Sequence, residues 1–335
     1  MKKYFKIVVL ALVVSSLVAA ALPGLADGPK VSWRLGSVLP ESHPVNKALV
    51  YFAERVGVLT KGEVKITVYP AGQLGQEADY LQGCSMGSIE VTKVSSSPLA
   101  QYVPQMDVVG LPFIWRNPDH QHAALDGKVG QMLAAFAAAK GFKVLSFMDA
   151  GFRNFTLRDK AVKTPADLKG LKIRTMQSKL MLDMVAAFGA TAVPMGQSDV
   201  YTALQTKVID GWENNEPTVL AFNMQEVCKY FSYSRHSSVP DILIVNKKLF
   251  DALSQANQRA MVKAGREATV SQRRIWADMI GDTISQLKAK GMIFNEVDDI
   301  KAFQAAVKPA IDKYVAESRV SADLNKLIKA IESAK

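Results

Sequence analysis

Two stretches in the middle of the chain decide the fold, Asp167-Leu-Lys-Gly-Leu-Lys-Ile-Arg174 and Val208-Ile-Asp-Gly-Trp-Glu-Asn-Asn215. The first reads as a short strand that ends on Arg174. The second reads as a strand and turn, one βαβ unit later, that carries a Glu-Asn-Asn run to the same edge. Open α/β sheets bind ligands in the crevice beyond their strand ends. Because the guanidinium fork of arginine matches a carboxylate, the pattern predicts a site for a small, polar, anionic solute.

The segments around these stretches alternate between strands and helices. Alternating apolar and polar residues predict strands at 31–38 and 64–69, with a helix from Pro44 to Gly57 between them. A strand–turn–helix–strand unit occurs twice, and both copies carry the turn Pro-x-Gly-Gln, at Pro70-Ala-Gly-Gln73 and Pro194-Met-Gly-Gln197. The 335 residues also exceed what one hydrophobic core comfortably fills. We therefore expect two α/β lobes that face one another.

The order of these units predicts where each lobe begins and ends. We expect residues 27–150 to form lobe 1, with 240–275 returning to it. Residues 151–239 are expected to form lobe 2, with 280–335 completing it. Apolar residues keep helical spacing from 254 to 290. At 1.5 Å per residue this helix is roughly 55 Å long, which exceeds the length of one lobe.

The first 26 residues read as an export signal and not as part of the fold. Lys2, Lys3 and Lys6 precede an apolar run from Ile7 to Ala21, and small residues precede a cut after Ala26. The apolar run is too short to span a bilayer comfortably. We therefore expect a periplasmic protein cleaved near Ala26, with an uncleaved N-terminal anchor as the alternative.

Charge and cysteine content limit the partners. The formal net charge is +10, and it falls to +7 without residues 1–26 because three lysines lie there. A basic balance can indicate nucleic acid. The lysines are scattered, however, and no basic run is interleaved with aromatic residues, so we predict no nucleic-acid partner. Cys84 and Cys228 each lie in an apolar helical context, which favours two buried free thiols over a disulfide.

Five segments match one family in order and in spacing. They are Pro70-Ala-Gly-Gln-Leu-Gly, Leu111-Pro-Phe, Gly151-Phe-Arg-Asn-Phe-Thr156, Leu168-Lys-Gly-Leu-Lys-Ile-Arg174 and Val208-Ile-Asp-Gly-Trp-Glu-Asn-Asn215. The chain thereby resembles the solute-binding proteins of the tripartite ATP-independent periplasmic (TRAP) transporters over nearly its whole mature length. The resemblance implies a two-lobed periplasmic binding protein fold, with a ligand cleft between the lobes and the long helix along both. It also implies hinge closure and delivery of the solute to integral-membrane subunits for ion-gradient-driven uptake.

Three candidate site residues follow from this resemblance. Arg174 stands at the position that makes the family's defining salt bridge to the ligand carboxylate. Asn214 matches the position that completes carboxylate recognition. Arg153 is placed at the cleft, where it would pair with the carboxylate or bond to hydroxyl groups. The alternative for Arg153 is a hinge arginine that pairs with an acidic residue.

The remaining candidates concern ligand class. Glu213 and Asn215 extend the run around Asn214, and a Glu-Asn-Asn run resembles the sugar-acid branch, where extra polar groups meet hydroxyls. Glu77, at the start of a helix that faces the cleft, either accepts hydroxyl bonds or stabilises the helix dipole. A carboxylate beside the ligand disfavours dicarboxylates by repulsion. We therefore predict a hexuronate or aldonate, with a C4-dicarboxylate as the alternative. His43, on the loop after the first strand, either bonds the ligand or caps a helix.

Enzyme chemistry is the remote alternative. The chain has no Walker A motif, no Gly-x-Ser-x-Gly and no His-Glu-x-x-His. A secreted sugar-acid lyase or hydrolase would have to use Glu213 together with Arg153. His120-Gln-His122 reads as part of a solvated helix in preference to a metal pair. We predict a monomeric binding protein that is not an enzyme and uses no cofactor or metal.

Overall fold

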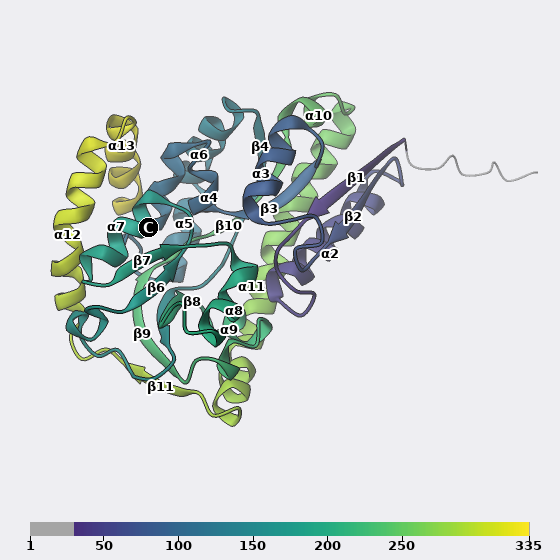
Figure 1. Cartoon of the computed structure of the whole chain (residues 1–335). Helices are drawn as coiled ribbons and strands as arrows, with labels where there is room; N and C mark the ends of the chain where they lie inside the picture. The colour runs from purple at the N-terminus through teal and green to yellow at the C-terminus, as the bar shows by residue number, and fades with distance from the viewer. Residues whose placement is uncertain (1–29, 335) are drawn as a thin grey trace, which may run out of the picture.

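The computed structural model describes residues 30–334, which form two α/β lobes, each built around its own sheet. Figure 1 shows the helices packed around the two sheets and the long helix α11 passing from one lobe to the other. The expected two-lobed α/β fold is therefore confirmed. The predicted export signal, residues 1–26, lies outside the described residues.

The first sheet has five strands in the order β2-β1-β3-β10-β4. In that order they span Val64–Tyr69, Val31–Gly36, Val91–Ser95, Asp241–Asn246 and Phe142–Met148. The β1–β2 and β1–β3 pairs are parallel, whereas β10 runs antiparallel to both β3 and β4. All six residues of β10 are buried, because the strand lies inside the sheet with both faces covered. Full burial explains the uninterrupted apolar run in this strand.

The second sheet has six strands in the order β11-β9-β5-β8-β6-β7. In that order they span Ile293–Glu296, Tyr230–Ser237, Arg153–Leu157, Gly211–Asn214, Lys172–Thr175 and Thr191–Pro194. The strand that the sequence predicts from Val208 begins three residues later, at Gly211, and Val208 itself is exposed. Glu213 and Asn214 are therefore strand residues, and neighbouring strand residues point to opposite faces of a sheet.

Helices and 3₁₀ turns, the latter labelled η, connect the strands and cover the sheets (Figure 1). In chain order they are α2 Pro44–Leu59, α3 Glu77–Met86, α4 Ser96–Leu99, η1 Pro104–Gly110, α5 Pro118–Asp126, α6 Lys128–Ala138, η2 Pro165–Leu168, α7 Lys179–Ala187, η3 Gln197–Asp199, α8 Val200–Gln205, α9 Glu216–Ala221, η4 Met224–Glu226, α10 Lys247–Asp251, α11 Gln255–Ala289, α12 Ile300–Glu317 and α13 Ser321–Glu332.

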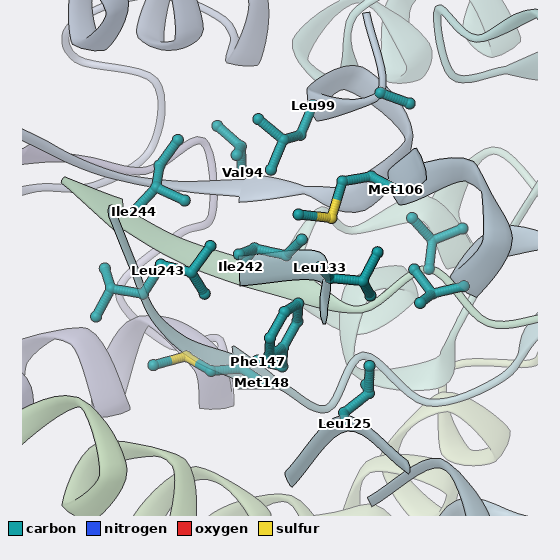
Figure 2. Close-up of a cluster of buried hydrophobic side chains, with 14 of the residues drawn as sticks. Val94, Leu99, Met106, Leu125, Leu133, Phe147, Met148, Ile242, Leu243 and Ile244 are labelled. Atoms are coloured by element: carbon teal, nitrogen blue, oxygen red, sulfur yellow. The ribbon is translucent and has the colours of Figure 1, made fainter. Parts of the chain in front are cut away.

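The core of the first lobe lies between the inner strands of its sheet and the helices beside them. Figure 2 shows the aliphatic side chains of β10 next to residues of β3, β4, α4 and η1. The labelled residues are nearly inaccessible to solvent; they include Val94, Leu99, Met106, Leu133, Phe147, Ile242, Leu243 and Ile244. Each fully buried side chain of this size contributes about 1.5–3 kcal/mol to stability.

The long helix α11 has 35 residues and ends within one residue of each predicted limit. Ser254 caps its N-terminus by accepting the backbone N–H of Asn257. The helix packs on α2 and β4 in the first lobe and on α9 in the second. Its buried Gln272 bonds both the N–H and the C=O of Asp149, where the chain leaves the first sheet, at 2.9 Å each. The helix therefore fixes one of the connections between the lobes.

The chain passes between the sheets three times: from Met148 to Arg153, back from Ser237 to Asp241, and again through α10 and α11 from Asn246 to Ile293. The first two passages contain residues 150–151 and 239–240, where the sequence analysis places the lobe boundaries. The C-terminal helix differs from the expectation that residues 280–335 complete lobe 2. α13 packs against α6 and η1 of the first lobe, because its apolar side chains Leu324, Leu327 and Ile331 are buried there. His120 strengthens this contact through a 2.8 Å bond to the Ile331 carbonyl.

Two further expectations concern single residues. Cys84 and Cys228 are both buried and free, as predicted, and burial raises the pKa of each thiol to about 12. His120, by contrast, is buried under α13 and is not part of a solvated face. No helix within residues 30–334 combines the length and the apolar character needed to cross a membrane.

Candidate functional site

A cavity lies between the two lobes, and six of the seven predicted site residues line it. The six are His43, Glu77, Arg153, Arg174, Asn214 and Asn215. The sequence reasoning missed other polar lining residues, which are Gln76, Lys93, Ser95, Gln177, Gln197, Thr218 and Asp241. The lobes are in contact around this cavity. Gln101 of the first lobe, for example, donates to the Gln177 carbonyl of the second at 2.8 Å.

Arg174 is a buried cation with no acidic partner among residues 30–334. Strand β6 positions it, and its Nε and Nη2 both donate to the Met195 carbonyl, at 3.1 and 2.8 Å. Nη1 donates to Gln197 Oε1 at 3.3 Å. A guanidinium has five N–H groups, so one remains free on each terminal nitrogen. Burial, with Arg153 nearby, lowers the pKa of Arg174 to about 10.

Arg153, on β5, is neutralised by Glu213 of the neighbouring strand β8. Its Nε and Nη2 contact the two carboxylate oxygens of Glu213, and Nη2 also reaches the Glu213 carbonyl at 2.6 Å. Burial alone would raise the pKa of Glu213, but the charge of Arg153 and contacts from Arg153 and His236 lower it to about 2. Arg153 therefore pairs with an acidic residue, as the alternative expectation for it stated.

Glu213 itself is fully buried behind Arg153 and does not line the cavity. The neighbouring Asn214 lines the cavity, whereas the Glu213 carboxylate is bound to the Arg153 guanidinium. The expected contact of Glu213 with ligand hydroxyls is therefore not available in this geometry. Both oxygens of its carboxylate accept hydrogen bonds from Arg153 instead.

The two asparagines divide their roles. Asn215 is the N-cap of α9: its Oδ1 accepts the Thr218 N–H at 2.8 Å, and its Nδ2 donates to the Ala150 carbonyl. Asn214 Oδ1 accepts from Asn215 and, at 3.4 Å, from Arg153. The amide Nδ2 of Asn214 has no partner within residues 30–334 and belongs to a residue of the cavity wall. Asn214 therefore presents a hydrogen-bond donor to the cavity, whereas Asn215 is occupied by the protein.

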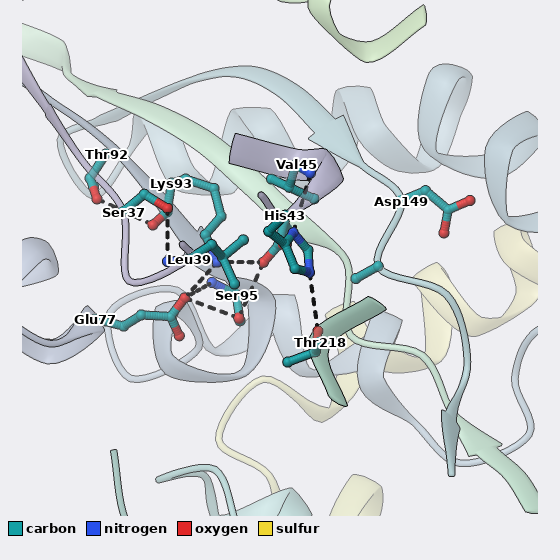
Figure 3. A network of polar contacts seen from close by, with 12 residues as sticks. Ser37, Leu39, His43, Val45, Glu77, Thr92, Lys93, Ser95, Asp149 and Thr218 are labelled. Atoms are coloured by element: carbon teal, nitrogen blue, oxygen red, sulfur yellow. Dashed lines mark hydrogen bonds and ion pairs between the residues drawn. The ribbon is translucent and has the colours of Figure 1, made fainter. Parts of the chain in front are cut away.

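The first-lobe wall contains a buried ion cluster of Glu77, Lys93 and Asp241 (Figure 3 labels the first two). Lys93 Nζ lies 3.0 Å from Glu77 Oε1 and 2.8 Å from Asp241 Oδ1. Ser95 adds its N–H and hydroxyl to the same Glu77 oxygen. The lysine is 2% exposed, so it is stable as a cation only because it has two acidic partners. The carboxylates raise the pKa of Lys93 against the effect of burial.

The two walls of the cavity therefore differ in charge. One cation and two carboxylates give the first-lobe cluster a formal charge of −1. On the second lobe, Arg153 is neutralised by Glu213, which leaves Arg174 as the uncompensated positive charge of that wall. A solute with an anionic end and a neutral polar end matches this arrangement.

His43 both caps a helix and bridges the lobes. Its Nδ1 accepts the Val45 N–H at the start of α2, at 3.2 Å. The neutral imidazole therefore carries its proton on Nε2, which lies 3.2 Å from Thr218 Oγ1 on α9 of the second lobe (Figure 3). Burial, followed by the charges of Lys93 and Lys47, lowers the pKa of His43 to about 3.

This shift predicts a loss of stability in mild acid. In the unfolded chain His43 takes up a proton below about pH 6.5, whereas in the folded protein it does so only near pH 3. The folded state therefore loses stability as the pH falls from 6.5 toward 3, by at most about 1.4 kcal/mol per pH unit. His43→Asn keeps an N-cap acceptor but cannot titrate. Urea unfolding at pH 7, 6 and 5 should show a shallower pH dependence for the variant, and identical slopes would contradict the assignment.

The described part of the chain contains no group of three or more His, Cys, Asp or Glu side chains that could hold a metal ion. The groups that line the cavity offer hydrogen bonds and charge to a ligand. The cavity's small size, buried arginine and polar walls are typical of solute recognition.

The family model of the bacterial extracellular solute-binding proteins, family 7, matches residues 35–318. The chain belongs to this family. It is similar to the 2,3-diketo-L-gulonate-binding periplasmic protein YiaO of Escherichia coli, with 34% identity over 323 residues that cover 96% of this chain and 98% of that protein. The function expected from the resemblance, solute binding for a TRAP transporter, is confirmed at the level of the family.

Solved structures of other TRAP solute-binding proteins have the same fold as this one. One, from Roseobacter denitrificans with bound β-D-glucuronate, superposes with a TM-score of 0.88 at 33% identity and covers 91% of this chain and 100% of that one. Another, from Sulfitobacter sp. NAS-14.1 with bound β-D-galacturonate, gives a TM-score of 0.87 at 33% identity, with 90% and 100% covered. The periplasmic binding protein fold, with its cleft between two lobes, is thereby confirmed.

Proposed function

We propose that this solute-binding protein captures a sugar acid, a hexuronate or an aldonate, and delivers it to TRAP membrane subunits. The observation that carries the proposal is Arg174, a buried cation that pairs with no acidic residue in the described part of the chain and keeps one free N–H on each terminal nitrogen. An uncompensated buried charge is costly, so the site favours an anion. A carboxylate matches two parallel N–H groups in a bidentate pair. Asn214 Nδ2 supplies a further donor to the ligand.

The ligand class follows from the opposite wall together with the relatives. The first-lobe cluster has a formal charge of −1, which suits hydroxyl groups and repels a second carboxylate. The relatives named above bind uronates or a keto sugar acid. A C4-dicarboxylate, the alternative ligand, would place its second negative charge near Glu77 and Asp241. The charge of this wall therefore favours the sugar acid.

Binding would proceed by hinge closure. Arg174 lies on the second lobe and Glu77 on the first, so a ligand contacts both only when the lobes are closed. The His43–Thr218 hydrogen bond joins the lobes beside the cavity and adds to the closed state. Water exclusion strengthens the charge-assisted bonds, and micromolar affinity corresponds to about −8 kcal/mol.

The remaining parts of the proposal concern the setting of the protein. Residues 1–26 would be removed on export, near Ala26, to give a monomeric periplasmic receptor. The protein would not be an enzyme, because a lyase or hydrolase would need Glu213, and this carboxylate is fully buried and bound to Arg153. It would use no cofactor.

Thermal unfolding of residues 27–335 against a panel of small acids and sugars tests this proposal. The panel contains hexuronates, aldonates, C4-dicarboxylates, 2-oxo acids and neutral hexoses. A ligand at a hundred times its dissociation constant adds about 2.7 kcal/mol to the free energy of unfolding, which gives a clear rise in Tm. We expect the largest rise with a hexuronate or aldonate. A rise with C4-dicarboxylates alone would retain the family and contradict the ligand class.

A further inference from the structure

The hydrogen bonds of Glu77 and Asp241 are distributed unevenly over their oxygens. Lys93 Nζ, the Ser95 N–H and the Ser95 hydroxyl all lie within 3.1 Å of Glu77 Oε1. At Asp241, Lys93 and the Ser95 hydroxyl both reach Oδ1, at 2.8 and 3.3 Å. No donor within residues 30–334 reaches Glu77 Oε2 or Asp241 Oδ2. Figure 3 shows this for Glu77, where the dashed lines meet one oxygen and leave the other free.

Both residues line the cavity between the lobes, although their side chains are only 14% and 7% exposed. A carboxylate oxygen that has no protein donor, on a residue that lines the cavity, keeps an open acceptor position for a ligand. Lys93 and Ser95 hold both carboxylates by their inner oxygens, so the geometry of the outer oxygens is set before any ligand arrives. Two fixed acceptors on one wall of the cavity match O–H donors of a ligand held in that cavity.

We propose that Glu77 Oε2 and Asp241 Oδ2 together form a subsite for two hydroxyl groups at the end of the ligand remote from its carboxylate. This subsite rests on the proposed function, since it requires that Arg174 take the carboxylate on the opposite lobe. Its chemistry selects a monocarboxylic acid with free hydroxyls at the far end. A hexarate has the same chain length but a second carboxylate. It is excluded because this carboxylate would place hydrogen-bond acceptors and a negative charge against Glu77 and Asp241, which are themselves negatively charged acceptors.

Calorimetric titration with a matched pair of ligands tests the subsite. D-Galacturonate and galactarate share the configuration of carbons 2 to 5, but galactarate has a second carboxylate in place of the aldehyde carbon and cannot close a pyranose ring. D-Galactonate, an open-chain acid with one carboxylate, is therefore titrated beside them and should also bind much more tightly than the hexarate. We expect wild-type protein to bind the uronate at least a hundredfold more tightly than the hexarate. Glu77→Gln and Asp241→Asn each keep an oxygen for Lys93 and put an amide N–H₂ donor in the place of the free acceptor. Each variant should weaken uronate binding about tenfold or more and should reduce the preference over the hexarate by a similar factor or more.

Asp79→Asn is the matched control. Asp79 lies on the same helix as Glu77 and bonds the Gln76 N–H, but it does not line the cavity. The control removes the same charge close by, and it should leave the uronate-to-hexarate ratio unchanged.

The outcomes separate the subsite from the proposed function. Wild-type protein that binds neither hexuronates nor aldonates would overturn the proposed function and the subsite with it. Wild-type protein that binds uronate and hexarate equally would overturn the subsite while leaving the carboxylate site at Arg174 intact. The subsite would also be overturned if the ratio of uronate affinity to hexarate affinity were the same in wild type, Glu77→Gln and Asp241→Asn. Urea unfolding of each variant identifies any loss of the folded state, and only folded variants enter the comparison.

Discussion

Replacing Arg174 with glutamine is expected to weaken sugar-acid binding by more than a hundredfold, about 2.7 kcal/mol or more. Removing one partner of a buried, hydrogen-bonded charge pair typically costs 2–5 kcal/mol or more. The variant loses the fork of N–H groups and the positive charge that offsets the first-lobe cluster. Titration of each protein with the uronate that gives the largest Tm rise checks this result.

The same substitution makes a second, opposite prediction for the protein without ligand. In wild type, Arg174 is buried and has no acidic partner between residues 30 and 334, so its removal should leave the free energy of unfolding unchanged or raise it. Lys172→Gln is the matched control, because Lys172 is an exposed residue two positions earlier on β6. A full ligand-induced Tm rise in Arg174→Gln would contradict the assignment. A large loss of unliganded stability would show that Arg174 is a structural residue.

Replacing Glu213 with glutamine is expected to destabilise the fold by about 3–5 kcal/mol, the typical cost of leaving a buried charge without its partner. Arg153 would keep a carbonyl and an amide oxygen but lose the negative charge that neutralises it. The folded-state pKa of Glu213, about 2, lies below its ordinary value near 4.5. Its stabilisation is therefore complete above about pH 4.5 and disappears as the pH falls through 2.

Urea unfolding at pH 7 measures the effect of Glu213→Gln. The double variant Arg153→Met, Glu213→Leu is the control, because it removes both charges and should recover much of the lost stability. Recovery would assign the loss to the unpaired guanidinium. A Glu213→Gln protein within 0.5 kcal/mol of wild type would show that the Arg153–Glu213 pair contributes little.

A residue or element could be predicted from the sequence where the residue type and its place in a strand or helix indicated the same role. Arg174 lies one residue before the end of β6, in a distinctive segment, and the long helix has capping residues and apolar spacing at both ends. The position of Glu213 was not predictable, because it depends on an ion pair with Arg153, which lies 60 positions earlier on the neighbouring strand β5. That pair occupies the Glu213 carboxylate, while Asn214 and Asn215 line the cavity.

The ion cluster shows a different limit. Lys93 and Asp241 are 148 positions apart, and only the antiparallel pairing of β3 with β10 brings them together. A signal was nevertheless present. Lys93 interrupts an otherwise uncharged strand, and Asp241 begins an apolar one. Charged residues in fully buried strands are rare unless they are paired, so each one indicates a partner elsewhere in the chain. The sequence alone does not say which partner it is.

The central claim is that Arg174, which is buried and has no acidic partner among residues 30–334, selects the carboxylate of a sugar acid. The most direct test is calorimetric titration of residues 27–335 with D-glucuronate and D-galacturonate, each beside its parent hexose, D-glucose or D-galactose. Each pair differs only by the carboxylate. The account predicts one-to-one binding of at least one uronate at micromolar affinity or better, and no detectable binding of the hexoses. A hexose that binds within tenfold of its uronate would contradict it.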